Sequence, residues 1–181
     1  MDVGGFALVT GAASGIGKAC AKAFIKEGAA GVALVGTNET ALQTARAEIE
    51  NLIVNMEPRA EASGSKGMPR RQPLVATYVL DVMEIQVKRV IEEAAANFGR
   101  LDYVVNSAGV PGMLCGVAST PTEDWKRELD VNLGGTFHVL RSATGIMLKQ
   151  SGPKRGSIVN IACAACPPQR PIRLRSTPSS G

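Results

Sequence analysis

The sequence predicts an α/β protein in which helices cover both faces of a parallel sheet. Short apolar runs, typical of strands buried on both sides, alternate with segments of helical periodicity. The 181 residues are 45% hydrophobic with a mean hydropathy of +0.07, which suits one domain with a packed core. A glycine-rich turn joins the first strand to the first helix. Together these observations favour a doubly wound sheet.

The first half of the chain supplies three strands and three helices. Strands are predicted at the apolar runs 6–10, 32–35 and 74–80. Helices are predicted where apolar side chains recur at helical spacing, over residues 15–27, 39–55 and 83–98. Residues 57–73 are rich in Gly, Pro, Ser and charged side chains, and so predict an exposed loop.

The second half adds two strands and a long helix. Strands are predicted over 101–106 and 157–161. Thr120, Pro121 and Glu123 have the pattern of a capping box, which predicts a helix from this point to Lys149, interrupted near Gly134-Gly135. Prolines and arginines follow, so we expect a domain over 1–166 and a disordered, basic tail over 167–181.

Positive charge is concentrated near the C-terminal end. The net charge is +4, yet residues 131–181 contain seven Lys and Arg and no Asp or Glu. Aromatic platforms for nucleic acid are missing there, so we interpret the basic tail as a solvated segment. No apolar run is long enough to span a bilayer, and the cysteines suggest neither disulfides nor a metal site. We expect a cytoplasmic protein that binds neither membranes nor nucleic acid.

The most informative segment is the turn Thr10-Gly-Ala-Ala-Ser-Gly-Ile-Gly17, between a strand and a helix. Glycines there let the backbone approach a pyrophosphate, which then accepts hydrogen bonds from the free N–H groups at the helix N-terminus. Glycine-rich loops also occur for purely structural reasons. With a strand before it and a helix after it, the turn predicts a dinucleotide site.

Five segments in order resemble the short-chain dehydrogenase/reductase family. They are the glycine turn, Asp81-Val82 after the third strand, Asn106-Ser-Ala-Gly109 after the fourth, the helical segment around Asn132, and the last strand, 156–161. The resemblance covers residues 5–162. It implies a Rossmann-type sheet of strand order 3-2-1-4-5, without the family's later strands. It also implies NAD(P)-dependent hydride transfer between an alcohol and a carbonyl compound.

The resemblance assigns cofactor contacts to Thr10, Gly11, Ser14, Gly15, Ile16, Gly17, Thr37, Asp81, Val82, Asn106, Ala108 and Gly109. Gly11 would permit the tight turn, and the backbone N–H groups of Ser14 and Ile16 would face phosphate. Asp81 would accept a hydrogen bond from the adenine amino group. It could also, or instead, cap the following helix. The resemblance also places Trp125 at a core position, so Trp125 is expected to pack and not to contact substrate.

The choice between NADP and NAD depends on the end of the second strand. An NAD-selective site has an acidic residue there, which binds the ribose 2′-hydroxyl. This sequence has Gly36 followed by Thr37 and Asn38, and no arginine takes the acid's place. A 2′-phosphate would not be repelled, so we favour NADP over NAD.

The family's catalytic pattern is incomplete in this sequence. A Tyr acts there as acid and base, a Lys four residues later lowers its pKa, and a Ser polarises the substrate carbonyl. Tyr78 and Tyr103 are the only tyrosines, and no Lys follows either at that spacing. Cys163 stands at the usual Ser position, and a thiol is a weak hydrogen-bond donor. Asn132 is the one catalytic position that matches.

Three explanations of this partial match stay open. The first, which we favour, is a truncated or mis-spliced product, because the match stops abruptly after Ala162. The second is a non-catalytic NADP-binding protein, for which a redox-sensing role fits. The third is an enzyme that takes its Tyr and Lys from elsewhere. A small alcohol or carbonyl substrate is expected only for a completed protein. Full-length relatives are expected to be homo-oligomers, and the exposed last strand predicts poor solubility or dependence on a partner.

Overall fold

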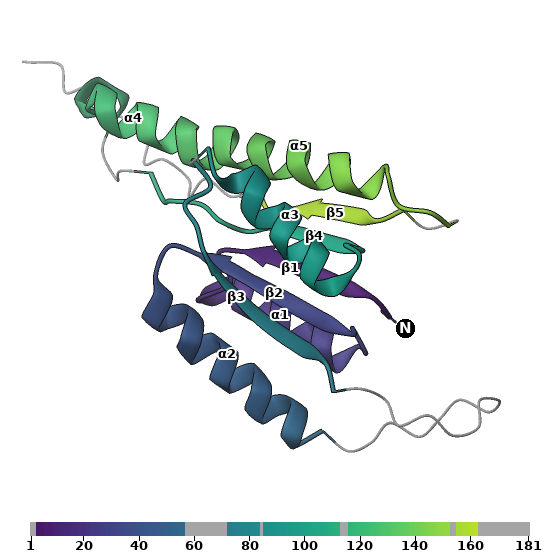
Figure 1. Cartoon of the computed structure of the whole chain (residues 1–181). Coiled ribbons are helices and arrows are strands. Elements are labelled where there is room, and N and C mark those ends of the chain that lie inside the picture. The colour runs from purple at the N-terminus through teal and green to yellow at the C-terminus, as the bar shows by residue number, and fades with distance from the viewer. Residues whose placement is uncertain (1–2, 57–71, 84, 113–115, 153–154, 163–181) are drawn as a thin grey trace, which may run out of the picture.

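The computed structural model (Figure 1) describes residues 3–56, 72–83, 85–112, 116–152 and 155–162. They form one sheet between two layers of helices. Several sequence predictions lie outside the described residues and stay predictions: the tail, the domain boundary at 166, most of the loop over 57–73, and Cys163.

The sheet is parallel with the strand order β3-β2-β1-β4-β5, which confirms the predicted topology. Its strands are β1 (Phe6–Thr10), β2 (Gly31–Gly36), β3 (Leu74–Val79), β4 (Tyr103–Asn106) and β5 (Ser157–Asn160). In the centre, Leu8 of β1 lies opposite Ala33 of β2 and Val104 of β4. The strand order reverses between β1 and β4, and ligands of open α/β sheets bind outside the carboxyl ends of the strands at such a point.

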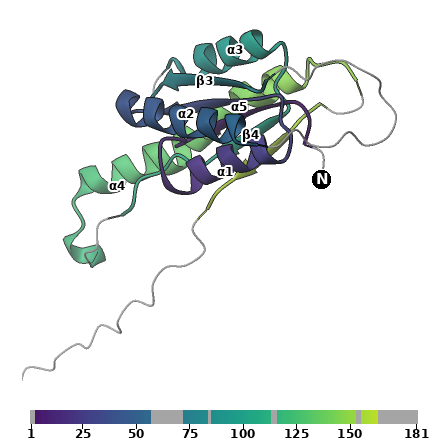
Figure 2. The same cartoon turned by 90° about the horizontal axis from the view of Figure 1, so that it is seen from below.

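Helices cover both faces of this sheet (Figure 2). On one face lie α1 (Gly15–Lys26) and α2 (Glu39–Val54), and on the other α3 (Val87–Phe98) and α5 (Thr136–Met147). A short 3-10 turn, Val117–Ser119, precedes α4 (Thr122–Leu129). The π-helical segment Asp130–Gly135 joins α4 to α5, and the three form one long rod in Figure 1. The irregularity predicted near Gly134-Gly135 is therefore a wide helical turn within a continuous rod.

Side-chain alternation along the strands divides the core into two clusters. Leu8 packs with α3 and α5, whereas its neighbours Ala7 and Val9 pack with α1 and α2. All three side chains are fully buried. Because both faces of the strand are apolar, it forms a continuous apolar run in the sequence, which is why the parallel sheet could be predicted.

Three elements begin later than predicted. The helix α3 begins at Val87 instead of Met83, because Asp81 Oδ1 accepts a hydrogen bond from Met83 N at 3.0 Å and the chain turns before the helix starts. Asp81 therefore does not cap α3. The strand β4 begins at Tyr103 instead of Leu101. The helix α4 follows Pro121 without any side-chain capping hydrogen bond, so the predicted capping box is wrong.

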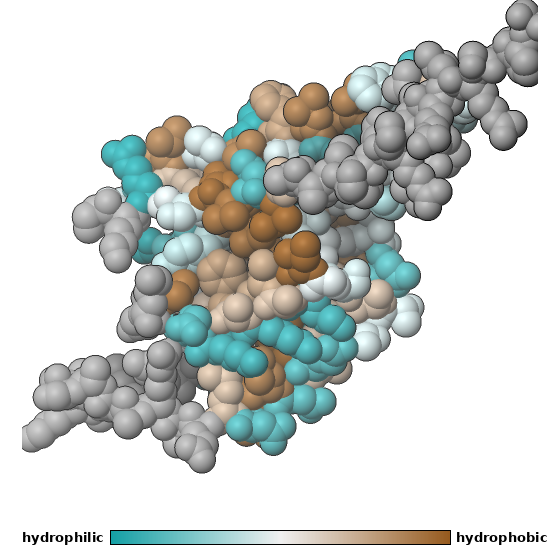
Figure 3. Space-filling model, turned by 180° about the vertical axis from the view of Figure 1, so that it is seen from behind, coloured by the Kyte–Doolittle hydropathy of each residue, from teal (hydrophilic) through white to brown (hydrophobic). Residues whose placement is uncertain are grey.

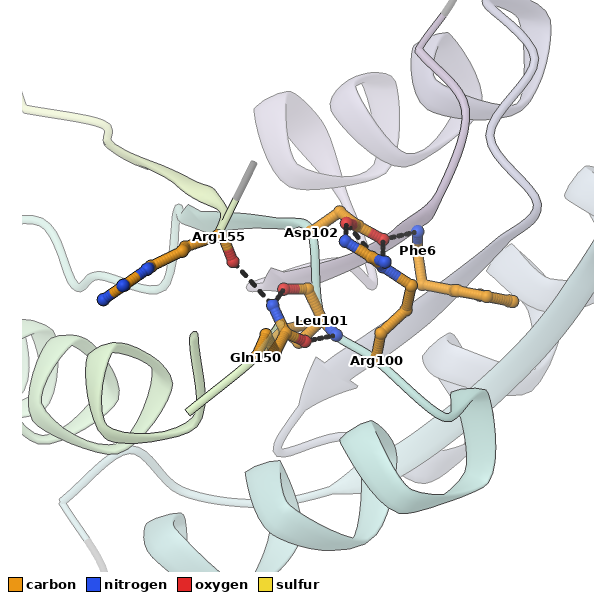
Figure 4. Close-up of polar contacts among 6 residues, drawn as sticks. All are labelled: Phe6, Arg100, Leu101, Asp102, Gln150 and Arg155. Atoms are coloured by element: carbon orange, nitrogen blue, oxygen red, sulfur yellow. Dashed lines mark hydrogen bonds and ion pairs between the residues drawn. The ribbon is translucent and has the colours of Figure 1, made fainter. Parts of the chain in front are cut away.

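A polar cluster fixes the amino end of the sheet (Figure 4). Gln150 Oε1 accepts from Leu101 N at 2.6 Å, and its Nε2 donates to the carbonyl oxygens of Leu101 at 3.0 Å and Arg155 at 2.6 Å. Asp102 accepts from Phe6 N at 2.9 Å and pairs with Arg100. The hydrogen bonds that the Arg100 guanidinium donates to the Asp102 carboxylate raise the pKa of Arg100. These contacts tie β1, β4 and the chain entering β5 at the end opposite the glycine turn.

Hydrophobic side chains remain exposed on two surfaces. Phe24 of α1 lines an apolar groove of about 280 Å³ beside β5, together with Val159 of β5 and Ile161. Figure 3 shows hydrophobic residues gathered on the face seen from behind. On the α4–α5 rod, Trp125 is 56% exposed and Leu133 67% exposed, so the prediction of a core position for Trp125 is wrong in this structure.

Candidate functional site

A cavity of about 310 Å³ opens at the carboxyl ends of β1 to β4. The sequence-predicted cofactor residues that line it are Thr10, Gly11, Thr37, Asp81, Val82, Ala108 and Gly109. They come from four separate segments, which the parallel sheet brings together. Ser14, Gly15, Ile16, Gly17 and Asn106 are not among its lining residues, and neither is Asn132.

The glycine turn lies too close to the loop after β4 to accommodate side chains. Gly11 has φ +64°, and a Cβ there would lie 2.8 Å from the carbonyl oxygen of Ser107. A Cβ at Gly17 would lie 3.1 Å from the carbonyl oxygen of Thr10 and closer still to that of Gly11. Such backbone-to-backbone contact is what the turn needs if a phosphate is to approach the helix.

The N-terminus of α1 is suited to an anion. Ser14 is its N-cap residue but makes no side-chain capping bond, and the first turn has no acidic residue. Ser14 and Ile16 are exposed, and Gly15 has φ +50° with open space where a Cβ would lie. The first backbone N–H groups of a helix have no intrahelical acceptor, and the helix dipole favours negative charge there. These residues fit the pyrophosphate of a dinucleotide.

Thr10 fixes the turn to the loop after β4. Its side chain is 2% exposed, and its Oγ1 accepts hydrogen bonds from the backbone N–H groups of Ser107 and Ala108, both at 3.1 Å. The threonine thus occupies two donors that would otherwise lack partners. Its hydroxyl positions Ala108 and Gly109 along the cavity wall.

Asp81 and Val82 form the wall beyond β3. Met83 N donates to Asp81 Oδ1, whereas no described residue donates to Asp81 Oδ2. Val82 is 5% exposed and touches the π-helical segment at Gly135, where a Cβ would lie 3.0 Å from the Val82 Cβ. Only a glycine lets the helical rod approach the Asp81-Val82 segment this closely.

The two asparagines that the sequence singled out serve as structural ties here. Asn132 Oδ1 accepts from Val110 N at 2.9 Å, and its Nδ2 donates to Val110 O at 3.0 Å. Asn106 is 4% exposed, and its Nδ2 donates to Asn160 Oδ1 at 2.8 Å. Asn106 Oδ1 has no hydrogen-bond partner among the described residues.

Arg127 and Val131 line the cavity although the sequence analysis did not identify them. They are four residues apart on the rod and therefore share one helix face. The sequence signal that could have identified Arg127 is its four-residue spacing from Val131, the residue before Asn132. In the described part of the chain no group of His, Cys, Asp and Glu could hold a metal ion. Nor does any helix there combine the length and apolar character needed to cross a membrane.

Comparisons with known proteins agree on one family. The sequence profile of the short chain dehydrogenase family matches residues 5–173. A 3-oxoacyl-[acyl-carrier-protein] reductase of Thermotoga maritima is 35% identical over 156 residues, which cover 86% of this chain and 54% of that protein. A D-threitol dehydrogenase of Mycolicibacterium smegmatis is 36% identical over 162 residues, which cover 90% of this chain and 54% of that protein.

Solved structures show the same likeness. An NAD⁺-bound xylitol dehydrogenase superposes with a TM-score of 0.71 at 30% identity, covering 86% of this chain and 51% of that one. A Shigella flexneri short chain dehydrogenase complexed with NADP gives a TM-score of 0.66 at 26% identity, and the match covers 86% of this chain and 57% of that one. The chain thus spans about half the length of the relatives it matches. It belongs to the short-chain dehydrogenase family.

Proposed function

We propose that this chain binds a nicotinamide dinucleotide across the carboxyl ends of β1 to β4, with a preference for NADP. The cavity that links the glycine turn to the Asp81-Val82 segment carries the proposal. The pyrophosphate would lie at the N-terminus of α1, against the backbone of Ser14 to Gly17. The adenine would lie beside Asp81 and Val82. The nicotinamide supplies hydride chemistry when bound, between an alcohol and a carbonyl compound.

The preference for NADP is supported by the end of β2. Gly36 and Thr37 line the cavity there, and neither carries a negative charge. An acidic residue at this position would bind the 2′-hydroxyl of NAD and repel the 2′-phosphate of NADP. Asp81 is the one acidic residue of the lining, and it follows β3 rather than β2.

We further propose that residues 1–181 by themselves bind the dinucleotide without turning it over. The side chains of Tyr78 and Tyr103 belong to β3 and β4 and pack against the two core clusters. No Lys follows either tyrosine at the family's spacing, so neither tyrosine can serve as the positioned proton donor that a developing alkoxide requires. A role as a non-catalytic NADP-binding protein is the alternative to a partial enzyme.

Fluorescence titration with NADPH and NADH, run beside an assay of NADPH oxidation with small carbonyl compounds, tests these proposals. We expect saturable binding, tighter for NADPH, without turnover. Gly11→Val serves as the negative control, because its side chain would collide with the Ser107 carbonyl. Tighter binding of NADH would overturn the NADP preference, and steady turnover would overturn the non-catalytic assignment. Failure of the wild-type chain to bind either cofactor would overturn the site itself.

A further inference from the structure

Two oppositely charged side chains line the cavity without pairing with one another. Asp81 follows β3, and Arg127 belongs to α4. Among the described residues, no carboxylate lies within ion-pair distance of the Arg127 guanidinium. Asp81 uses Oδ1 for Met83 N and keeps Oδ2 without a donor from those residues. The cavity therefore presents a free acceptor and free donors to whatever fills it.

The position of Arg127 follows from how the rod is docked. Asn132 is bound through two hydrogen bonds to the backbone of Val110, and Gly135 lies directly against Val82. Val131, four residues after Arg127, is 7% exposed and packs in the same core cluster as Val82. Arg127 thus projects from the same helix face as a residue that is anchored beside the Asp81-Val82 segment.

We propose that Arg127 recognises the adenine base by donating a hydrogen bond to its N7, while Asp81 accepts one from the 6-amino group. This inference rests on the proposed dinucleotide site. Adenine presents N7 as an acceptor and the amino group as a donor on one edge, so a guanidinium donor and a carboxylate acceptor that line the same cavity complement it. A base with a 6-oxo group would place an acceptor against the Asp81 carboxylate and be disfavoured.

The alternative ligand for Arg127 is the 2′-phosphate of NADP. The ribose 2′ position belongs to the end of β2, which here is Gly36 and Thr37. Arg127 instead belongs to the helical rod whose Gly135 lies directly against Val82, where a Cβ on Gly135 would be 3.0 Å from Val82 Cβ. The neighbourhood of Asp81 and Val82 is where the base would lie, so the geometry favours the base over the phosphate.

Calorimetric titration of the 181-residue chain with NAD, NADP and the 7-deaza-adenine analogue of NAD tests the proposal. Arg127→Ala is the test variant. Lys126→Ala is the matched control, since it removes the same charge from the same helix at a residue outside the cavity lining. For Arg127→Ala we expect binding of NAD and NADP to weaken by the same factor, about tenfold, as for a good contact to a base edge. Lys126→Ala should bind like the wild type.

The 7-deaza analogue replaces N7 by a C–H group and removes the acceptor. The wild type should bind it about tenfold more weakly than NAD, whereas Arg127→Ala should bind the two alike, since the two changes remove one interaction. Unchanged affinity of Arg127→Ala would overturn the proposal. So would a loss confined to NADP, which would assign Arg127 to the 2′-phosphate. If the wild type binds none of these ligands, the proposed function fails and the inference falls with it. Equal melting temperatures of wild type and variant would confirm that the variant is folded.

Discussion

The contact between Gly135 and Val82 gives a sharp test of how the cavity is built. In Gly135→Ala the new Cβ would lie 3.0 Å from Val82 Cβ and closer to its Cγ2. Val82 is buried, so it has little room to move. In Gly134→Ala, the neighbouring substitution in the same π-helical segment, the nearest atom in the new methyl's surroundings is Leu129 O at 3.8 Å. The two variants differ in packing and match in chemistry.

The magnitude follows from two effects. Replacing Gly by Ala in a helix gains about 1 kcal/mol in both variants. Overpacking against a buried side chain costs about 1–3 kcal/mol and applies to Gly135→Ala alone. The free energy of unfolding should therefore be about 1–3 kcal/mol lower in Gly135→Ala than in Gly134→Ala, or roughly 2–12 °C in Tm for a domain of this size.

The assay is thermal unfolding of both variants followed by titration with NADPH. Gly134→Ala should melt at or above the wild-type temperature and bind like the wild type. Gly135→Ala should melt at a lower temperature than Gly134→Ala and bind NADPH more weakly, because the new methyl group pushes the rod away from the Asp81-Val82 wall. Equal melting temperatures and equal affinities of the two variants would show that the close approach of Gly135 to Val82 does not shape the site.

Three further predictions concern ties outside that contact. Gln150→Ala would leave the buried N–H and C=O of Leu101 unpaired, so it should lower the free energy of unfolding by about 2–4 kcal/mol in denaturant titrations. A loss below about 0.5 kcal/mol would contradict the stabilising role of the Gln150 side chain. Thr10→Val would leave the N–H groups of Ser107 and Ala108 without their acceptor, so it should lower the free energy of unfolding by about 1–3 kcal/mol and weaken NADPH binding. Thr10→Ser keeps the hydroxyl and should preserve both stability and binding. Equal stability and affinity of the two variants would contradict this role of the Thr10 hydroxyl. Hydrogen bonds from Lys22 and Lys18 lower the pKa of Glu48, so Glu48 should stabilise the α1–α2 contact fully above its unfolded-state pKa and lose that contribution as the pH falls through the lower folded-state pKa. In Glu48→Gln, the free energy of unfolding should therefore fall less steeply with decreasing pH in the acid range. An acid-range slope equal to that of the wild type would contradict this prediction.

The regular elements of this fold were predictable because their local signals are strong. Strands buried on both faces form continuous apolar runs, and the glycine turn lies where a strand must reverse into a helix. The start of α3 was not predictable from periodicity, since Asp81 turns the chain through a hydrogen bond to Met83 before the helix begins. The capping box predicted for α4 was wrong for a similar reason, because the sequence pattern specifies possible hydrogen-bond partners and not the bonds that form.

The candidate site was predictable where the family pattern marks it and not where tertiary packing builds it. Thr10, Gly11 and Asp81 were identified from the sequence, and the structure places them on one cavity. Arg127 lies more than 40 residues from Asp81 in the chain, and only the docking of the rod brings both to that cavity. Trp125 has the residue type of a core position, yet whether it is covered depends on what packs against the rod.

An NMR titration of the isotope-labelled 18.9 kDa chain with NADPH tests the proposed dinucleotide site most directly. We expect the backbone amide signals of the turn from Gly11 to Gly17 and of Val82 to move together and to saturate at one affinity, because one dinucleotide spans both walls. Signals at the amino end of the sheet, such as Leu101, should stay in place. Absence of change at the glycine turn, or saturating changes confined to the apolar groove beside β5, would contradict the claim that this cavity is a dinucleotide site.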